Sequence, residues 1–182
     1  MKLLRDIEDI IISGDQLQKK VAELGAQITK DYQGREPVLV CVLKGAMMFL
    51  TDLSRHIALP VSFDFMEVSS YHGTETTGVV RITKDLKGTI EGKDVIIVED
   101  ILDSGLTLTY ITKLLKTRNP HSLKICSLLD KKDARITPVT LDYKGFDIPD
   151  KFVVGYGLDY NEFYRNLNFI GVLKSSVYKG DE

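Results

Sequence analysis

Several residue types and patterns are scarce in this sequence, and each scarcity excludes a class of protein. Its 182 residues include two cysteines and no tryptophan, so a disulfide-rich secreted scaffold is excluded. No apolar run is long enough to span a bilayer. Neither sign of charge dominates, because 24 basic and 26 acidic residues leave a net charge of −2, which argues against a surface for polyanions. The hydrophobic share of 43% and the charged share of 27% are typical of a globular domain with an ordinary core.

The two cysteines each lie in an apolar segment that has the pattern of a strand. We therefore expect Cys41 and Cys126 to be buried free thiols in a reducing compartment, rather than a disulfide or a nucleophile. The first residues, Met-Lys-Leu-Leu-Arg-Asp, place charges where a secretory signal needs an apolar stretch. The expectation is a cytoplasmic protein without a membrane or nucleic-acid partner.

Apolar patterning predicts strands that alternate with helices. Helical spacing covers residues 13–31 and 46–56 and resumes after residue 106. Strand patterns cover residues 38–43, 61–65, 79–83, 95–98 and 123–129. Strands separated by helices predict an α/β fold with a mostly parallel, doubly wound sheet flanked by helices. We expect one domain over residues 1–182, with a core of about residues 13–132 and a small hood lobe from about 1–12 and 133–182.

The stretch over residues 95–108, Val-Ile-Ile-Val-Glu-Asp-Ile-Leu-Asp-Ser-Gly-Leu-Thr-Leu, joins a buried strand to the start of a helix. An open α/β sheet binds its ligands at such a junction. Gly105 permits a positive φ and a close approach of the backbone, while Ser104 and Thr107 add hydroxyl groups. The helix start adds free amides and the positive end of its dipole, so the loop predicts a site for a phosphate monoester.

Three acids accompany this loop. Glu99 and Asp100 are poor partners for a phosphate but good acceptors for sugar hydroxyls, directly or through Mg²⁺. A phosphate at one end and vicinal hydroxyls at the other describe a ribose 5-phosphate. The alternative is that the acids, including Asp103, only cap the helix. A cap needs one such residue, and here three acids surround Ser-Gly-x-Thr.

The stretch resembles the phosphoribosyl-pyrophosphate signature of the type I phosphoribosyltransferases. From about residue 10 to 174 the chain resembles the hypoxanthine-guanine members of that family. The resemblance implies the type I fold with its hood, and transfer of the 5-phosphoribosyl group from phosphoribosyl pyrophosphate to N9 of hypoxanthine or guanine. The products would be IMP or GMP and pyrophosphate, with Mg²⁺ required. Asp103 would face N7 of the purine as the general base, and the residues binding the ribose phosphate would be Glu99, Asp100, Ser104, Gly105, Leu106 and Thr107. Many members have Thr and Lys where this chain has Ser104 and Leu106.

A second junction, Leu-Lys-Gly-Ala over residues 43–46, also places amides and a positive charge between a strand and a helix. Taken alone, this pattern favours an ordinary turn. The resemblance implies that Lys44 and Gly45 contact the pyrophosphate, often with a cis peptide before the lysine, and that Arg165 reaches the same group. Members often have a second glycine at the position of Ala46.

Lys131 follows a predicted strand and has donors only, so it suits a 6-oxo group and disfavours a 6-amino one. By resemblance, Lys131 belongs to the purine site together with Phe152, which would stack on the base, and Val153, whose backbone would face the base edge. Asp159 would lie at the same site and, with Glu99 and Asp100, would help to hold Mg²⁺. Without the resemblance, a phenylalanine such as Phe152 is more often a core residue, and the alternative for the lysine is a solvated charged run.

Residues 69–78, Ser-Ser-Tyr-His-Gly-Thr-Glu-Thr-Thr-Gly, have little apolar content and predict an exposed loop. The resemblance implies that Ser70 and Tyr71 belong to a lid that closes over the reacting centre and excludes water. Family members usually form homodimers or homotetramers. A transferase preferring xanthine remains an alternative, as does an RNA-binding regulator on the same scaffold, although Lys131 argues against adenine as the base.

Overall fold

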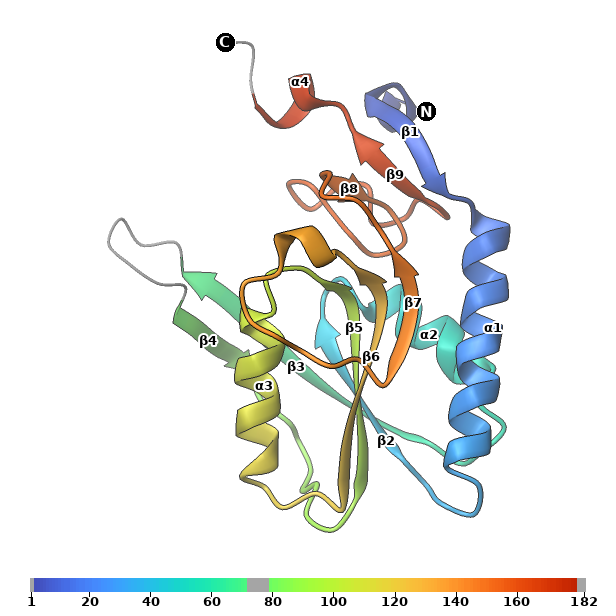
Figure 1. Cartoon of the computed structure of the whole chain (residues 1–182), viewed down its shortest axis with the longest axis vertical. Helices are drawn as coiled ribbons and strands as arrows, with labels where there is room; N and C mark the ends of the chain where they lie inside the picture. The colour runs from blue at the N-terminus through green and yellow to red at the C-terminus, as the bar shows by residue number, and fades with distance from the viewer. Residues whose placement is uncertain (1, 72–78, 180–182) are drawn as a thin grey trace.

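The computed structural model describes residues 2–71 and 79–179, which form two unequal sheets (Figure 1). Within these residues the larger sheet has six strands in the order β4-β3-β2-β5-β6-β7. Their bounds are Val38–Leu43 for β2, Ser62–Tyr71 for β3, Val79–Lys84 for β4, Asp94–Leu102 for β5, Ser122–Asp130 for β6 and Tyr143–Asp147 for β7. Neighbouring strands pair in parallel except β4, which runs antiparallel to β3 at the edge. The predicted mostly parallel sheet is confirmed.

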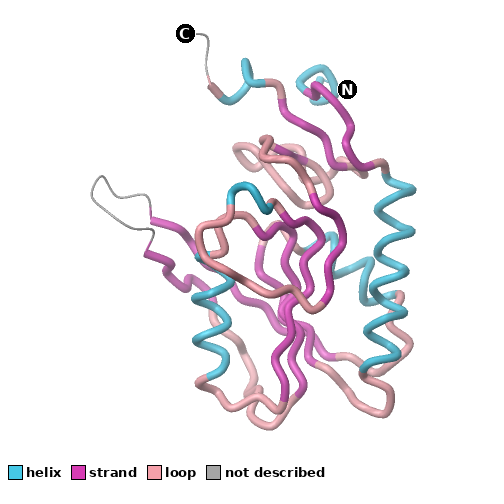
Figure 2. The backbone as a smooth tube through the Cα atoms, viewed as in Figure 1, coloured by secondary structure: helices cyan, strands magenta, loops and turns pink. Residues whose placement is uncertain are grey.

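Helices cover both faces of this sheet (Figures 1 and 2). Helix α1, Gly14–Asp31, and helix α2, Met47–Arg55, pack on one face, and helix α3, Leu106–Lys116, packs on the other. Helix α1 begins as the sequence predicts, because Ser13 and Gln16 form a capping box. The doubly wound arrangement is therefore also confirmed.

The central strand β5 is buried on both faces, which explains its continuous apolar composition. Ile96 and Val98 pack toward α1 and α2, whereas Val95 and Ile97 pack toward α3. Cys41, on the neighbouring strand β2, is a buried free thiol as expected, and burial raises its pKa to about 12. The same is true of Cys126 on β6, whose pKa burial also raises.

The smaller sheet brings the two ends of the chain together in a hood above the first sheet (Figure 1). Its antiparallel order is β1-β9-β8, with β1 at Ile7–Ile12, β8 at Val153–Val154 and β9 at Ile170–Leu173. Short helical turns flank it: η1 at Lys2–Asp6 and α4 at Ser175–Tyr178. A turn η2 at Lys132–Ala134 follows β6.

The core sheet extends beyond the boundary expected near residue 132, because strand β7 pairs in parallel with β6. The sequence Tyr-Lys-Gly-Phe-Asp of β7 lacks the apolar run of a central strand. Strand β7 lies at the edge of the sheet, which explains its polar residues. Its Tyr143 is buried, and Gly145 lies so close to β6 that an added Cβ would sit 2.2 Å from the Leu128 carbonyl oxygen.

No helix in residues 2–71 and 79–179 has both the length and the apolar character needed to cross a membrane.

Candidate active site

The predicted phosphate loop lies where β5 ends and α3 begins. A cavity of about 190 Å³ is lined there by Glu99, Ile101, Leu102, Asp103, Ser104, Gly105, Thr107 and Leu108. Gly105 has a φ of 85° and forms the N-cap of α3, so this position needs the left-handed conformation that glycine allows. The structure thus brings Glu99 and Asp103 together with the loop, with the start of α3 facing it. Leu106 is 39% exposed and does not line the cavity with its side chain.

The segment that follows η2 holds this loop in place through hydrogen bonds to its carbonyl groups. The amides of Ile136 and Thr137 donate to the Ser104 carbonyl at 2.9 and 3.0 Å. Arg135 Nε donates to the Asp103 carbonyl at 2.9 Å. These bonds satisfy the carbonyls of Asp103 and Ser104 and hold the loop in place, while the Leu106 amide donates to Ser104 Oγ at 3.4 Å.

Glu99 and Asp100 face different loops, although they are neighbours in the sequence. Glu99 is buried beside the phosphate loop, and its Oε2 atom has no hydrogen-bond partner among the described residues. Burial, and secondarily the charge of Asp100, raise the pKa of Glu99 well above its usual range. Asp100 instead lies against the Lys44–Gly45 loop, where an added Cβ on Gly45 would be 1.6 Å from Asp100 Oδ2. Burial raises the pKa of Asp100 to about 6.

These carboxylates suit Mg²⁺ as a metal shared with a substrate. The described residues contain no group of three His, Cys, Asp or Glu side chains that would hold an ion alone. Mg²⁺ keeps several waters and binds through one or two carboxylates together with substrate phosphates. A buried carboxylate oxygen without a partner, as in Glu99, is the type of group that such an ion or a ribose hydroxyl would satisfy.

The second predicted loop follows β2, and the Leu43–Lys44 peptide bond is cis. A turn from the hood packs directly on it, since an added Cβ on Gly157 would be 1.9 Å from the Gly45 carbonyl oxygen. Arg165 Nη1 donates to the Gly157 carbonyl at 2.7 Å. Lys44 and Arg165, the two cations predicted for pyrophosphate, therefore both lie where the Gly157 turn packs on the Gly45 loop.

Both of these cations are paired with carboxylates. Glu162 accepts from Lys44 Nζ at 3.2 and 3.1 Å through its two oxygens, and from Arg165 Nη2 at 3.3 Å. Asp159 Oδ1 lies 2.9 Å from Arg165 Nη2, and Asp159 Oδ2 accepts from the Glu162 amide at 2.9 Å. Asp159, predicted for Mg²⁺ and the purine site, is thus tied here to the guanidinium.

Two of the predicted base-binding residues, Lys131 and Phe152, line another cavity, of about 390 Å³, whereas Val153 and Asp159 do not. Lys131 is 8% exposed, with Nζ 3.6 Å from Asp103 Oδ2 and 3.5 Å from Asp150 Oδ1. Phe152 is 38% exposed and stacks on Tyr178, with ring centroids 4.9 Å apart and planes at 20°. The cavity is lined by Glu8, Lys131, Asp150, Lys151, Phe152, Val172, Leu173 and Tyr178. Lys131 thereby links the acid at 103 to this cavity.

Val153 is buried in strand β8, where it pairs with Val172 of the hood sheet. Its side chain is therefore part of the core, and only its backbone is available to a ligand. The main chain of Ser70 and Tyr71 ends strand β3. The side chains of both residues, and residues 72–78 of the predicted lid, lie outside the described part of the chain.

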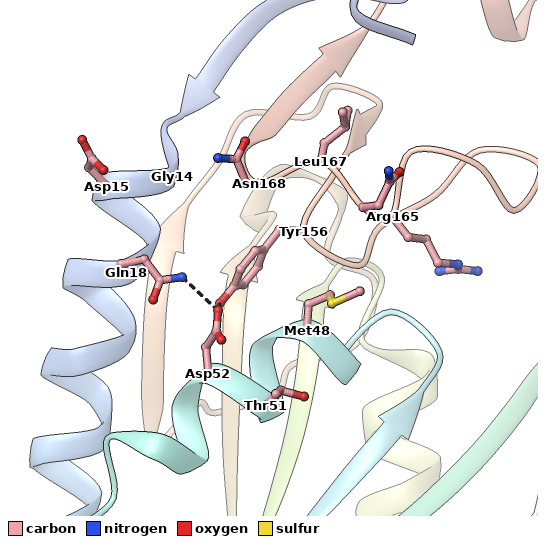
Figure 3. Close-up of a pocket in the computed structure, with 11 residues that line it drawn as sticks. Gly14, Asp15, Gln18, Met48, Thr51, Asp52, Tyr156, Arg165, Leu167 and Asn168 are labelled. Carbon is pink, nitrogen blue, oxygen red and sulfur yellow. Dashed lines mark hydrogen bonds between the residues drawn. The ribbon is translucent and has the colours of Figure 1, made fainter. Parts of the chain in front are cut away.

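A further cavity, of about 410 Å³, lies between α1, α2 and the hood segments at residues 156 and 165–168 (Figure 3). Asp52 on α2 accepts hydrogen bonds from the Tyr156 hydroxyl at 2.7 Å and from Gln18 of α1 at 2.9 Å. The guanidinium of Arg165 points away from Asp52 and Tyr156 (Figure 3), and its Nη2 donates to Glu162, which also accepts from Lys44. The bond between Tyr156 and Asp52 ties helix α2 to the turn whose Gly157 packs on Gly45.

Three residues of these constellations were not identified from the sequence: Asp150, Glu162 and Tyr178. The spacing of Asp159, Glu162 and Arg165 by three residues was a local signal for one of them. The contact of Glu162 with Lys44 spans 118 residues, so no spacing could have indicated it. Tyr178 reaches Phe152 only because the chain end folds into the hood.

Comparison with known proteins agrees with this geometry. Residues 11–161 match the model of the phosphoribosyl transferase domain. The hypoxanthine-guanine phosphoribosyltransferase of Bacillus subtilis (strain 168) is 52% identical over 175 residues, covering 96% of this chain and 97% of that protein. The enzyme of the same name from Mycobacterium tuberculosis (strain ATCC 25618 / H37Rv) is 51% identical over 181 residues, covering 96% of this chain and 90% of that protein.

A crystal structure of a hypoxanthine phosphoribosyltransferase from Staphylococcus aureus superimposes with a TM-score of 0.94 at 52% identity, covering 98% of this chain and 97% of the other. Both the sequence match and the structural match therefore extend over nearly the whole length of the chain and of these relatives. The chain belongs to the phosphoribosyltransferase family, within the group of the hypoxanthine-guanine phosphoribosyltransferases.

Proposed function

We propose that this chain is a purine-salvage transferase that moves the 5-phosphoribosyl group from phosphoribosyl pyrophosphate to N9 of hypoxanthine or guanine. The products are IMP or GMP and pyrophosphate. The observation that carries the proposal is the cavity that Glu99 and Asp103 share with the phosphate loop at Gly105. It has acceptors for a sugar at one end and donors for a phosphate at the other.

The 5-phosphate binds to the amides of residues 104–107 and to the hydroxyls of Ser104 and Thr107. The start of α3 favours its negative charge. The buried oxygen of Glu99 accepts from the ribose hydroxyls or faces the metal. These contacts orient C1′ toward the base, which supplies the proximity that a displacement reaction needs.

The difficult part of the reaction is the departure of pyrophosphate from C1′, which becomes cationic. Lys44 and Arg165 stabilise the charge that develops on pyrophosphate, together with the amides of the Gly45 loop. When bound, Mg²⁺ would supply further charge stabilisation, and Glu99, Asp100 and Asp159 are the carboxylates that would hold it. The acids near C1′ also favour the developing positive charge.

At the base, Asp103 accepts the proton from N7 as N9 attacks, and returns it in the reverse direction. Lys131 donates to the 6-oxo group, and its approach to both Asp103 and Asp150 holds the ammonium in place. Phe152 stacks on the purine, and the backbone of Val153 faces its edge. Ser70 and Tyr71 belong to the lid that closes over these groups.

The proposal includes a cytoplasmic homodimer or homotetramer. Light scattering after size-exclusion chromatography would measure the assembly.

The experiment that tests the proposed function is pyrophosphate release with hypoxanthine, guanine, xanthine or adenine, each with and without Mg²⁺. We expect turnover with hypoxanthine or guanine only when Mg²⁺ is present. Turnover with xanthine above both would identify a xanthine-preferring enzyme. Absence of turnover with every base would contradict the proposal.

A further inference from the structure

Glu162 occupies the space between the two cations predicted for pyrophosphate. Its carboxylate bonds to Lys44 at 3.2 and 3.1 Å and to Arg165 at 3.3 Å. The side chain of Glu162 is 64% exposed, and an exposed glutamate carries its charge at neutral pH. One carboxylate thus contacts two cations, Lys44 and Arg165, that lie far apart in the sequence.

The local backbone presents this carboxylate to the cations. Asn161 and Glu162 both have a positive φ, of 50° and 66°, which is uncommon for residues other than glycine. The amide of Glu162 donates to Asp159 at 2.9 Å, and Tyr160 and Phe163 close the turn in an antiparallel bridge. The turn therefore fixes the backbone from which the Glu162 side chain reaches the two cations.

The contact does not serve to hold the fold together. The side chain of Glu162 is 64% exposed and that of Lys44 is 53% exposed, and exposed ion pairs contribute little to stability. Arg165 keeps its place without Glu162, because it also bonds to the Gly157 carbonyl at 2.7 Å and to Asp159 at 2.9 Å. The main effect of the Glu162 contact is therefore on the charge around Lys44 and Arg165, and its effect on the stability of the fold is small.

We propose that Glu162 is an internal competitor for the pyrophosphate group. This inference rests on the proposed function, since it assigns Lys44 and Arg165 to pyrophosphate. A carboxylate and a phosphate use the same donors of lysine and arginine, and two anions cannot share them without repulsion. The diphosphate therefore displaces Glu162 when it binds, and the carboxylate returns to the cations when pyrophosphate leaves. Glu162 lowers the affinity for the diphosphate and assists its release.

The test is the binding of inorganic pyrophosphate, with Mg²⁺, to the full chain carrying Glu162→Gln, measured by isothermal titration calorimetry. The amide keeps the size of the side chain but removes the charge. The Lys44 pair is exposed, and in the second pair Glu162 is 64% exposed while Arg165 is 20% exposed. We therefore expect pyrophosphate to bind roughly 3- to 10-fold more tightly. Glu162→Asp keeps the charge but shortens the side chain, and should give a smaller increase.

Glu23→Gln is the matched control. It makes the same change of charge at an exposed helical pair, in which Glu23 lies 2.7 Å from Lys20, and it should leave the affinity for pyrophosphate unchanged. Unchanged or weaker binding in Glu162→Gln would overturn the inference, as would an equal gain in Glu23→Gln.

Turnover of the same variants separates this inference from the proposed function. We expect Glu162→Gln to lower the KM for phosphoribosyl pyrophosphate and to slow the release of pyrophosphate in single-turnover experiments. If the unmodified chain turns over no purine, the proposed function fails. If it is active but pyrophosphate binds equally to both forms, only the role of Glu162 fails.

Discussion

The Asp103 carboxylate lies 3.6 Å from the ammonium of Lys131. The two residues follow adjacent strands, β5 and β6, so the parallel pairing of these strands sets their approach. Lys131 is also 3.5 Å from Asp150, and its amide donates to the Leu102 carbonyl at 2.9 Å. The group proposed to accept the N7 proton and the group proposed to hold O6 are thereby fixed relative to one another in the folded chain.

Replacing Asp103 by asparagine should affect the chemical step and not the binding of the sugar phosphate. The carboxamide keeps the size of the side chain but cannot accept the N7 proton. We expect kcat to fall about 10²- to 10⁴-fold, with the KM for phosphoribosyl pyrophosphate changed by less than about threefold. Steady-state kinetics with hypoxanthine would measure both. Equal losses in kcat and in sugar-phosphate binding would contradict a role as general base.

Replacing Lys131 by glutamine should weaken the binding of 6-oxopurines. A hydrogen bond from a charged donor contributes about 1.5–3 kcal/mol, so we expect the KM for hypoxanthine to rise roughly 10- to 100-fold. The adjacent Lys132 is the control, because its side chain is 61% exposed and pairs with Asp147 at 3.0 Å. Lys132→Gln should leave the KM for hypoxanthine nearly unchanged. An equal rise in KM in both variants would mean that Lys131 acts through its positive charge alone and makes no specific contact with the base.

Replacing Tyr178 by alanine should raise the KM for the purine without changing that for phosphoribosyl pyrophosphate. Tyr178 stacks on Phe152 at 4.9 Å, and Tyr160 contacts the same ring edge-on at 5.7 Å. An aromatic pair contributes about 0.5–1.5 kcal/mol, which predicts an increase in KM of roughly 2- to 10-fold. Tyr178→Phe keeps the ring and should behave like the unmodified chain. A loss of activity in Tyr178→Phe would instead point to its hydroxyl.

The sheet and the phosphate loop could be predicted because their signals are local. A buried apolar strand followed by Asp-Ser-Gly-Leu-Thr specifies both the loop and its place at the sheet edge. The separation of Glu99 from Asp100 follows from a rule that the sequence already contained, since successive side chains of a strand point to opposite faces. Treating the two acids as one pair missed this.

Other features depend on contacts that no local pattern contains. Strand β7 is short and mostly polar, and only its pairing with β6 makes it part of the core sheet. The meeting of Lys44 with Glu162 requires the hood turn to pack on Gly45, where Gly157 leaves room for no side chain. Such relationships depend on how separate segments pack, so they become visible only in the folded chain.

Replacing Tyr156 by phenylalanine should loosen the hood turn on the pyrophosphate loop. The hydroxyl donates to Asp52 at 2.7 Å, and its loss leaves that carboxylate with Gln18 as its remaining hydrogen-bond donor in the cavity of Figure 3. We expect a destabilisation of about 1–2 kcal/mol and a several-fold higher KM for phosphoribosyl pyrophosphate. Chemical denaturation and steady-state kinetics would measure these. The control is Tyr110→Phe, at a ring that is 39% exposed on α3. Lower stability with an unchanged KM would assign Tyr156 to the fold alone.

The stability of the fold should depend on pH through Asp64 on β3. Burial works against the charged form of this carboxyl, but the amides of Gly88, Lys87 and Phe65 donate to it and together hold its pKa below the usual value. Because the pKa is lower in the folded chain, the stabilisation is fully present above the unfolded pKa of about 3.8 and is lost as the pH falls through the folded value.

The variant that tests this is Asp64→Asn, which keeps the shape but removes the charge that the three amides bind. We expect the variant to be about 1–2 kcal/mol less stable at pH 7, with the difference shrinking as the pH falls below 4. Urea unfolding at pH 7, 5 and 3.5 would measure it. Asp85→Asn is a useful comparison, because its carboxylate pairs with Arg118 at 2.7 Å and is 48% exposed, so its effect should be smaller and sensitive to salt. A difference for Asp64 that stays constant with pH would mean that the amides bind the neutral side chain equally well.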